Sequence, residues 1–171
     1  DGGLVLTTTQ VWTTISNCLG ITGTYCIELA ATETCQDGAC VRSEYAYDEY
    51  GHPVSEYRYG DPNVSGDELS LHRTYYPNTE DWIISAPALE RLYSVITDDI
   101  GGAALEQETT YLYDGHSSAA LSPTLGALTS ISQGLASWGL ASSQYLYDDW
   151  GNVRVVTDTL GRATVTEYDE V

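Results

Sequence analysis

Residues 145–158 read YLYDDWGNVRVVTD, and this stretch decides the fold. Tyr145 and Tyr147 are separated by one residue, so both rings fall on the same face of an extended chain. Asp148 is placed to accept hydrogen bonds from the amides that follow it, and Gly151 can take the positive φ that a tight reversal needs. The β-branched tail then returns along a partner strand. The stretch therefore predicts one β-hairpin.

The same pattern occurs elsewhere in the chain. Residues 45–54, YAYDEYGHPV, repeat the tyrosines, the aspartate and the glycine at the same spacing. Residues 111–114, YLYD, repeat the head, and we predict that the matching glycine is Gly126, with residues 115–125 inserted at the hairpin tip. Residues 157–169 give a half-copy. Internal repetition of this kind indicates repeated structural units.

We assign the repeated residues an architectural role in shaping turns and packing one hairpin on the next. They are Tyr45, Tyr47, Asp48, Gly51, Tyr111, Tyr113, Asp114, Tyr145, Tyr147, Asp148, Gly151, Asn152, Gly161 and Arg162. The alternative is that the aromatic stripes stay exposed and stack on sugars.

The YDDWGN of residues 147–152 and the LGR of residues 160–162 resemble the YD-repeat, or Rhs-repeat, family. The resemblance is strongest over residues 41–171, and none is claimed for residues 1–40. The wording of residues 59–68 is also similar to segments beside the virulence-type toxins that carry these repeats. In such relatives, strips of long hairpins form a hollow shell around a toxic C-terminal polypeptide. In animal teneurins a similar shell belongs to a cell-surface protein.

The resemblance implies an all-β fold in which repeated antiparallel β-hairpins form a curved, extended sheet. We expect a Thr-rich β segment with the four cysteines at residues 1–40 and a hairpin strip at residues 41–171, as one continuous unit. The implied location is secreted or cell surface. The implied partners are flanking repeats of the same or a neighbouring chain and an enclosed polypeptide, with glycans as a further candidate. The chain has no initiating Met, so we expect a piece of a longer protein with any export signal outside it.

The pattern also predicts local elements. Short Thr-rich strands are expected at residues 4–9, 11–15 and 25–29. Residues 79–84 are expected to form a single helical turn, capped by their first residue and anchored by Trp82. A reversal is expected at residues 98–102.

All four cysteines precede the repeats, at positions 18, 26, 35 and 40. If the protein is exported, as the resemblance implies, we favour the disulfides Cys18–Cys26 and Cys35–Cys40, the second closing over an Asp-Gly turn. Two alternatives stay open. One is a four-thiolate zinc site, although the spacing departs from the usual close pairs. The other is a set of reduced, buried thiols.

The charge is strongly acidic. Six arginines oppose 25 carboxylates, giving a formal net charge of -19 with no lysine. Such a chain is repelled by phosphate, which argues against nucleic-acid binding and against anionic membrane surfaces. No apolar run is long enough to span a bilayer. We interpret the scattered carboxylates as a solvated surface, with an acidic wall that holds a basic polypeptide as the alternative.

Residues 60–68 are the one candidate metal loop, because oxygen-bearing side chains alternate there before a glycine. The candidate calcium ligands are Asp61, Asn63, Ser65 and Asp67. The second half of the loop departs from a calcium pattern, since His72 stands where a bidentate Glu is expected. A polar tip whose Asn and Asp cap their own turns explains the same letters, and we favour it. No other cofactor is expected.

No catalytic site is predicted. Adjacent acids are frequent but point to opposite faces of a strand, the three histidines are dispersed, and no GxSxG elbow occurs. The expected function is therefore that of a non-enzymatic structural segment of a large secreted Rhs/YD-repeat protein, which helps to build a β-shell around a toxin or another polypeptide. The alternative is a cell-surface carbohydrate-binding or adhesion module.

Overall fold

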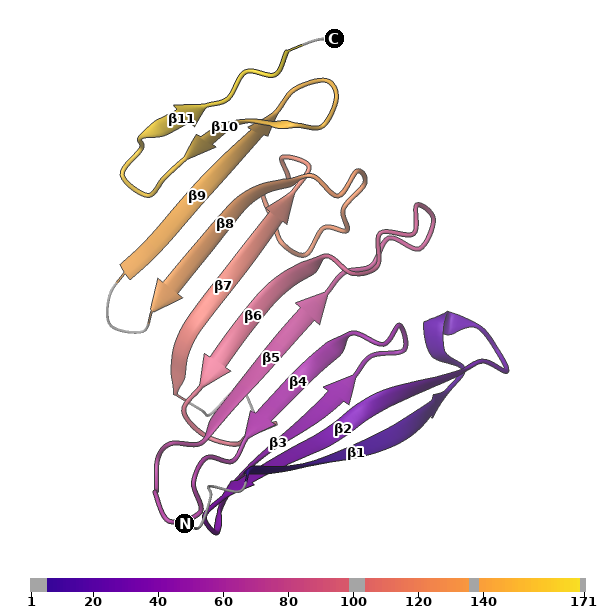
Figure 1. The fold of residues 1–171 in the computed structure, drawn as a ribbon. Helices are drawn as coiled ribbons and strands as arrows, with labels where there is room; N and C mark the ends of the chain where they lie inside the picture. The colour runs from indigo at the N-terminus through magenta and orange to yellow at the C-terminus, as the bar shows by residue number, and fades with distance from the viewer. Residues whose placement is uncertain (1–5, 99–103, 136–138, 170–171) are drawn as a thin grey trace. The chain divides into compact units, whose positions relative to one another are not determined.

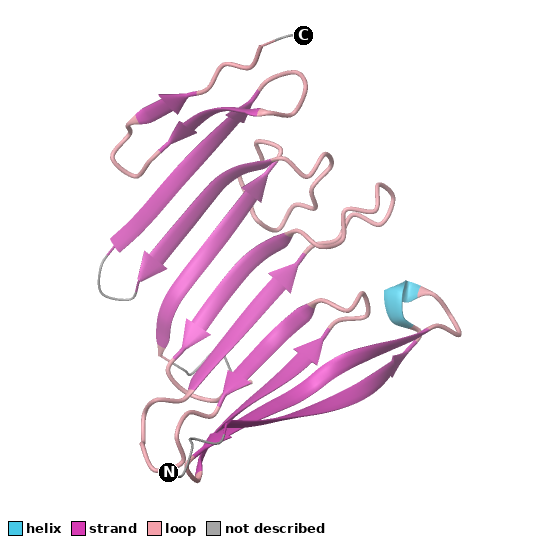
Figure 2. Cartoon of the chain, viewed as in Figure 1, coloured by secondary structure: helices cyan, strands magenta, loops and turns pink. Residues whose placement is uncertain are grey.

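The structure is a computed structural model that describes residues 6–98, 104–135 and 139–169. Its described part consists of strands joined by turns, with one short 3-10 segment, η1 (Cys18–Gly20) (Figure 2). The strands are β1 (Leu6–Ser16), β2 (Tyr25–Gln36), β3 (Ala39–Tyr47), β4 (Pro53–Arg58), β5 (Leu69–Tyr75), β6 (Pro87–Tyr93), β7 (Leu105–Tyr113), β8 (Leu128–Leu135), β9 (Gly139–Tyr147), β10 (Val153–Thr157) and β11 (Ala163–Val165) (Figure 1). The predicted all-β class is confirmed.

The strands form one 11-stranded sheet whose spatial order, β1 to β11, is the order along the chain. Each strand therefore pairs with its neighbours in sequence, as in a succession of hairpins. Contacts between residues divide the chain into two compact units, Asp1–Arg73 with Arg91–Glu106, and Thr74–Glu90 with Gln107–Val171. We describe each unit by itself.

In the first unit, β1 and β2 form a long antiparallel hairpin that runs from the Leu6–Gln36 pair to the Ser16–Tyr25 pair. The prediction of two separate strands at residues 4–9 and 11–15 is wrong. From Leu6 onward they are a single strand, interrupted only by a shift of register between Val11 and Trp12. The extra residue of this β-bulge is Ala30 of β2, because the consecutive residues Val11 and Trp12 face Ala31 and Leu29, and β1 continues through it without a break.

The next hairpin, β2–β3, reverses through Asp37 and Gly38, whose φ values are 52° and 87°. Cys35 and Cys40 are direct partners across this hairpin and form a disulfide, and a second disulfide joins Cys18 to Cys26. These are the pairs favoured from the sequence. The oxidised sulfurs rule out the four-thiolate zinc site and the reduced thiols.

In the second unit, residues 79–84 do not form the expected helical turn. The backbones of Asn78 and Ile83 bond each other in both directions, at 3.0 and 2.9 Å, and enclose a tight turn. Asn78, rather than the following Thr79, caps this turn, because its Oδ1 accepts the amides of Glu80 and Asp81, each at 3.0 Å. Trp82 has a left-handed φ of 58° and is 55% exposed, so it does not anchor the turn.

Few of the described side chains are buried. The apolar ones below about a tenth exposed are Cys18, Ala31, Ile84, Ala88 and Tyr93, and the polar ones are Glu28, Ser70 and Thr109. Large apolar side chains such as Trp12 and Ile27, by contrast, are 56% and 73% exposed. The hydrogen-bonded ladder and the disulfides therefore carry much of the stabilisation that a closed core supplies in an ordinary domain.

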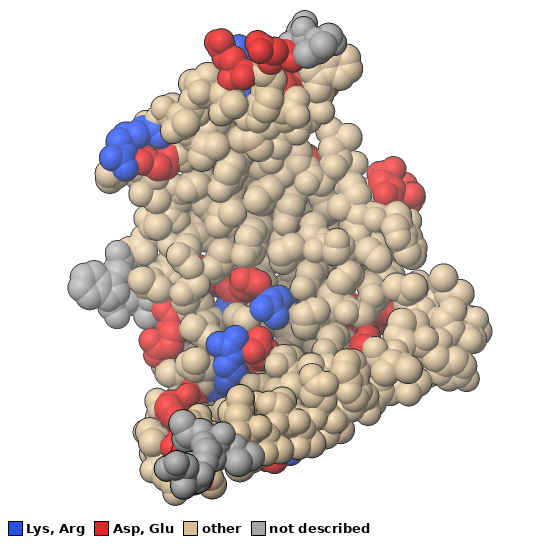
Figure 3. All heavy atoms as spheres, viewed as in Figure 1, with Lys and Arg blue, Asp and Glu red and all other residues tan. Residues whose placement is uncertain are grey.

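The described residues contain no helix that is long and apolar enough to cross a membrane. Carboxylates on the face shown in Figure 3 lie in small scattered groups, and arginines lie beside them. Arg42 with Glu44, Arg58 with Glu56 and Arg162 with Asp158 are ion pairs of this kind, at 2.6–2.7 Å. The predicted turn at 98–102 and the start of the strand predicted at 4–9 lie largely outside the described residues.

Candidate functional site

The candidate site is a set of turns that share one geometry. In the turns 48–52, 148–152 and 158–162, the amide of the leading Asp donates to the carbonyl of the fifth residue, and the Gly amide donates to the Asp carbonyl. Oδ1 of the same Asp accepts the amides of the third and fifth residues. All of these bonds are 2.8–3.1 Å long. One carboxylate thus satisfies the backbone of each reversal.

The second carboxylate oxygen of each Asp bonds the side chain of the fifth residue. Nδ1 of His52 lies 3.1 Å from Asp48 Oδ2, and Nδ2 of Asn152 donates to Asp148 at 3.0 Å. In the half-copy, Nε of Arg162 donates to Asp158 at 2.7 Å. Different side chains therefore fill this position because each carries a nitrogen donor of suitable reach.

These bonds favour the ionised form of Asp148 and of Asp158. The bond from Asn152 is the main cause of the lowered pKa of Asp148, and the bond from Arg162 is the main cause of the lowered pKa of Asp158. The glycines of these turns, Gly51, Gly151 and Gly161, have φ values of 86°, 83° and 76°. A side chain at any of them would strain the backbone.

The predicted insertion follows the same plan on a larger scale. The Asp114 amide donates to the Ala127 carbonyl at 2.7 Å, and Gly126 has a φ of 76°. Oδ2 of Asp114 accepts the amides of residues 124–126 at 2.6–3.3 Å, and Oδ1 accepts that of Ala127 at 2.8 Å. Burial raises the pKa of Asp114, but these four backbone bonds outweigh it and the net shift is downward. Gly126 thus occupies the place of the motif glycine.

The second tyrosine of each head connects its strand to the strand before it. Its hydroxyl donates to a backbone carbonyl at 2.7–3.1 Å, and a fourth tyrosine, Tyr168, does the same. The pairs are Tyr47 with Leu29, Tyr113 with Pro87, Tyr147 with Leu128 and Tyr168 with Val153. Burial is the main cause of the raised pKa of the first three of these hydroxyls. Tyr168-Asp169 therefore acts as a further head that the sequence reading had treated only as part of a half-copy.

The first tyrosines of the heads lie on the same strands as the second ones. Tyr45 pairs with Glu56, and Tyr145 pairs with Val156 across their hairpins. Tyr111 donates its hydroxyl to Glu90 at 3.1 Å. These tyrosines are half-buried in the sheet, so they take part in strand packing.

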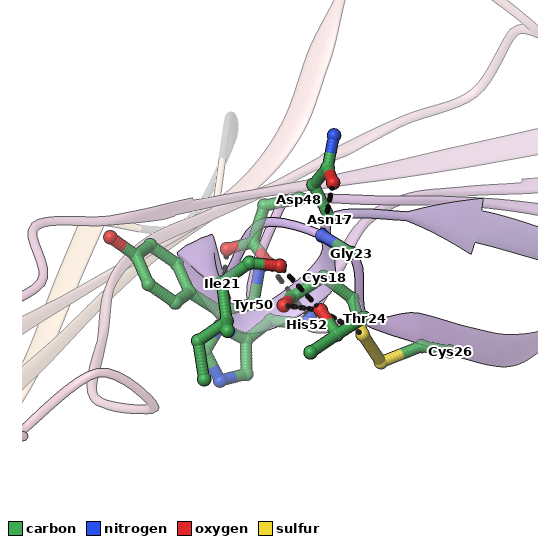
Figure 4. The surroundings of a disulfide bond; sticks show 9 residues. All are labelled: Asn17, Cys18, Ile21, Gly23, Thr24, Cys26, Asp48, Tyr50 and His52. Atoms are coloured by element: carbon green, nitrogen blue, oxygen red, sulfur yellow. Dashed lines mark hydrogen bonds and ion pairs between the residues drawn. A yellow bond between two sulfur atoms is a disulfide. The ribbon is translucent and has the colours of Figure 1, made fainter.

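The first turn has a cover that the sequence did not reveal. The loop between β1 and β2, closed by the Cys18–Cys26 disulfide, lies beside Asp48, Tyr50 and His52 (Figure 4). The Leu19 amide donates to the Glu49 carbonyl at 2.5 Å, and Cys18 is only 2% exposed. The disulfide thus holds in place the loop that covers turn 48–52.

The last full turn instead borders an open cavity of about 800 Å³. Its lining residues are Tyr147, Asp148, Asp149, Trp150, Asn152, Arg154, Thr166, Glu167, Tyr168 and Asp169. Trp150 is 80% exposed and Tyr168 is 50% exposed. Three aromatic residues, an asparagine and several charged residues therefore line this cavity.

The candidate calcium ligands lie in the loop between β4 and β5, where they bond their own backbone. Asp61 Oδ1 accepts both nitrogens of Asn63, and Asp67 Oδ2 accepts the Asp61 amide, each at 2.9 Å. Ser65 is exposed. The described residues contain no group of three or more His, Cys, Asp or Glu side chains that could hold a metal ion. The contacts fit the favoured turn interpretation, and calcium binding stays a prediction that calorimetric titration would test.

One polar pair was missed from the sequence. Ser55 and His72 are direct partners between β4 and β5, with Oγ 3.0 Å from Nδ1. Nε2 of His72 lies 2.8 Å from the Thr97 carbonyl, and the rings of Tyr57 and Tyr93 pack edge-on against the imidazole. The surrounding rings make this a packed structural contact. Only the register of β4 against β5 could have revealed it.

Comparisons with known proteins support the fold. No protein-family model matches the chain, and no curated protein matches it. Among solved structures, a chain of the Photorhabdus luminescens Tc holotoxin pore, solved with a mutation in TccC3, is similar with a TM-score of 0.53 and 9% identity. The match covers 97% of this chain and 14% of that chain. Nearly the whole of this sheet is thus similar in fold to a small part of a toxin-complex chain.

Proposed function

We propose that the chain is a non-enzymatic structural segment of a large secreted Rhs/YD-repeat protein, in which it forms part of a β-shell around a toxin or another polypeptide. The observation that carries the proposal is the repeated turn. The Asp, Gly and Tyr groups of the motif are engaged in shaping reversals and in bonding the preceding strand. Residues used in this way build a scaffold and are not free to act on a substrate.

Three further observations support it. The likeness in fold to the Tc holotoxin chain agrees with a place in a larger assembly of polypeptides. The two disulfides agree with an extracellular location, because disulfides persist in oxidising compartments. The sequential strand order also leaves β1 and β11 with one described neighbour each, so flanking repeats or a neighbouring chain can extend the sheet.

Small-angle scattering combined with light scattering on the purified chain tests the proposal. A shell segment is expected to behave as an open sheet, or to associate through its edge strands as concentration rises. A compact monomer at all concentrations would show that the sheet closes on itself, and would contradict the proposal.

A second candidate function is carbohydrate binding at the cavity beside turn 148–152. The exposed Trp150 and Tyr168 offer faces for stacking on a sugar ring, and Asn152 and Arg154 offer hydrogen bonds at its edge. The carboxylates that line the cavity favour neutral over sulfated sugars.

Titration of neutral oligosaccharides followed by tryptophan fluorescence or calorimetry tests this candidate. Trp150→Ala is expected to abolish binding, whereas Trp12→Ala, at an exposed tryptophan of β1, is expected to leave it unchanged. Equal loss in both variants, or no binding by the parent chain, would exclude the cavity as a sugar site.

A further inference from the structure

One buried acid is not explained by the repeat geometry. Glu28, on β2, is only 7% exposed, and neither of its carboxyl oxygens has a hydrogen-bond partner among the described residues. Buried polar groups are ordinarily satisfied, so an unpartnered carboxyl group calls for a specific explanation.

Glu28 lies against the first repeat turn. A Cβ built on Gly51 would lie 3.2 Å from Glu28 Oε1, so the carboxyl group packs directly on the motif glycine. The negative charge of Asp48, in the same turn, contributes to the raised pKa of Glu28. The charge of Glu28 contributes in turn to the raised pKa of Tyr47 on β3. His52 bonds Asp48 at 3.1 Å, and Glu49 and Tyr50 are the other titratable residues of the turn.

No arginine or histidine among the described residues bonds either carboxyl oxygen of Glu28. The backbone and ring nitrogens of His52 and the amide of Tyr50 already bond the two oxygens of Asp48, which leaves none of these nitrogens to Glu28. An ionised carboxylate in this place would lose hydration without gaining a partner, and it would be repelled by Asp48. Burial, and then the charge of Asp48, accordingly raise the pKa of Glu28.

We propose that Glu28 is a proton-binding position that makes the contact between β2 and turn 48–52 sensitive to pH. With its proton in place, the neutral side chain packs against Gly51 and the turn stays closed. When the proton is lost, the carboxylate moves toward water, and turn 48–52 separates from β2 and from the disulfide-closed loop, which stays attached to β2 through Cys26. The chain therefore carries a local switch that is closed in mild acid and loosened at higher pH.

The sign follows from linkage. The pKa of Glu28 is raised in the folded chain. Below the ordinary value of 4.5, Glu28 holds its proton in both the folded and the unfolded chain, and it therefore does not lower the stability of the fold. The loss of stability grows as pH rises from that value through the raised pKa, and above the raised pKa it is complete.

The other turns provide an internal control. A Cβ on Gly151 or Gly161 would meet no atom within 4 Å, so no carboxyl group packs on either glycine. The pKa values of Asp148 and Asp158 are lowered, so these two turns lose stability as pH falls, which is opposite to the effect expected for Glu28. Loosening at rising pH should be confined to turn 48–52.

The test compares Glu28→Gln with the parent chain by thermal unfolding between pH 4 and pH 8. Gln imitates the protonated acid, so we expect equal Tm values near pH 4 and a Tm that is higher than that of the parent by about 3 °C or more at pH 8. Glu33→Gln, at an exposed position of the same strand, removes one charge without the buried contact and is expected to follow the parent. An unchanged Tm difference across the pH range would overturn the proposal.

Two measurements keep the proposal open to refutation if the variant folds poorly. An NMR titration of the parent chain should give Glu28 a carboxyl midpoint above 4.5, and a midpoint at or below it would overturn the proposal. Amide exchange, corrected for the intrinsic effect of pH, should speed up with rising pH in turn 48–52 and not in turn 148–152. If His52→Asn abolishes this acceleration while Glu28→Gln preserves it, the switch belongs to His52 and the proposal fails.

Discussion

Replacing Asp114 by Ala tests the idea that one carboxylate organises an entire repeat turn. The substitution removes the acceptor for the amides of residues 124–127, four bonds of 2.6–3.3 Å. Charge-assisted bonds are worth up to about 3 kcal/mol each, but the tip is partly exposed and its freed amides can bond water. We therefore expect about 0.5–1 kcal/mol for each bond and a total loss of about 2–4 kcal/mol.

The assay is thermal and urea unfolding of Asp114→Ala beside Asp149→Ala, a matched acid that is exposed. We expect Asp114→Ala to lower Tm by about 5–15 °C and Asp149→Ala to change it little. Because the pKa of Asp114 is lowered in the folded chain, its contribution is present above the ordinary value of 3.8 and lost as pH falls. The gap between the parent and the Asp114 variant should therefore close in strong acid. A loss of less than about 0.5 kcal/mol at neutral pH would refute the reasoning.

Three further predictions concern the turns, a disulfide and a tyrosine. Gly151→Ala should lower the free energy of unfolding by about 1–2 kcal/mol because of its φ of 83° alone. Gly51→Ala should lower it further because the added Cβ also meets Glu28. Urea unfolding of both variants checks this order, and equal losses would contradict it. Replacing Cys18 and Cys26 together by Ser should remove about 2–3 kcal/mol and expose turn 48–52 to faster amide exchange, whereas unchanged exchange would show that the loop does not seal the turn. Tyr147→Phe should cost about 1 kcal/mol by leaving a carbonyl of β8 without its hydroxyl donor, and a neutral result would mean that water replaces the bond.

The sequence predicted the turns because their determinants are local. Asp148 and Gly151 bond within five residues of chain, so spacing alone encodes the geometry. Gly126 could be matched to Asp114 across an insertion because only a glycine tolerates the required φ and because a strand resumes directly after it. The Cys35–Cys40 disulfide could be favoured because an Asp-Gly reversal lies between the two thiols, and both pairs depended on the export that the family resemblance implies.

The sequence-based predictions failed where contacts with distant segments of the chain determine the local structure. The turn around Trp82 was misassigned because Asn78 supplies both the cap and a bond to the Pro123 carbonyl, which local pattern does not show. The continuity of β1 depends on its pairing with β2, which runs from residue 6 to residue 16 and takes up a bulge at Ala30, so the local pattern divided a single strand. Glu28 had no signal, since a Glu in an alternating strand is ordinarily solvated and its burial depends on the turn that packs over it.

The strictly sequential strand order has a consequence for how the chain reaches its final state. Every strand finds its partners among its immediate neighbours in sequence, so the sheet can grow one hairpin at a time as the polypeptide emerges from a ribosome or an export channel. No strand needs to wait for a distant segment to be synthesised. Assembly can therefore be vectorial, with each completed hairpin serving as the template for the next, and a pause during synthesis would leave a shorter sheet rather than a misfolded one.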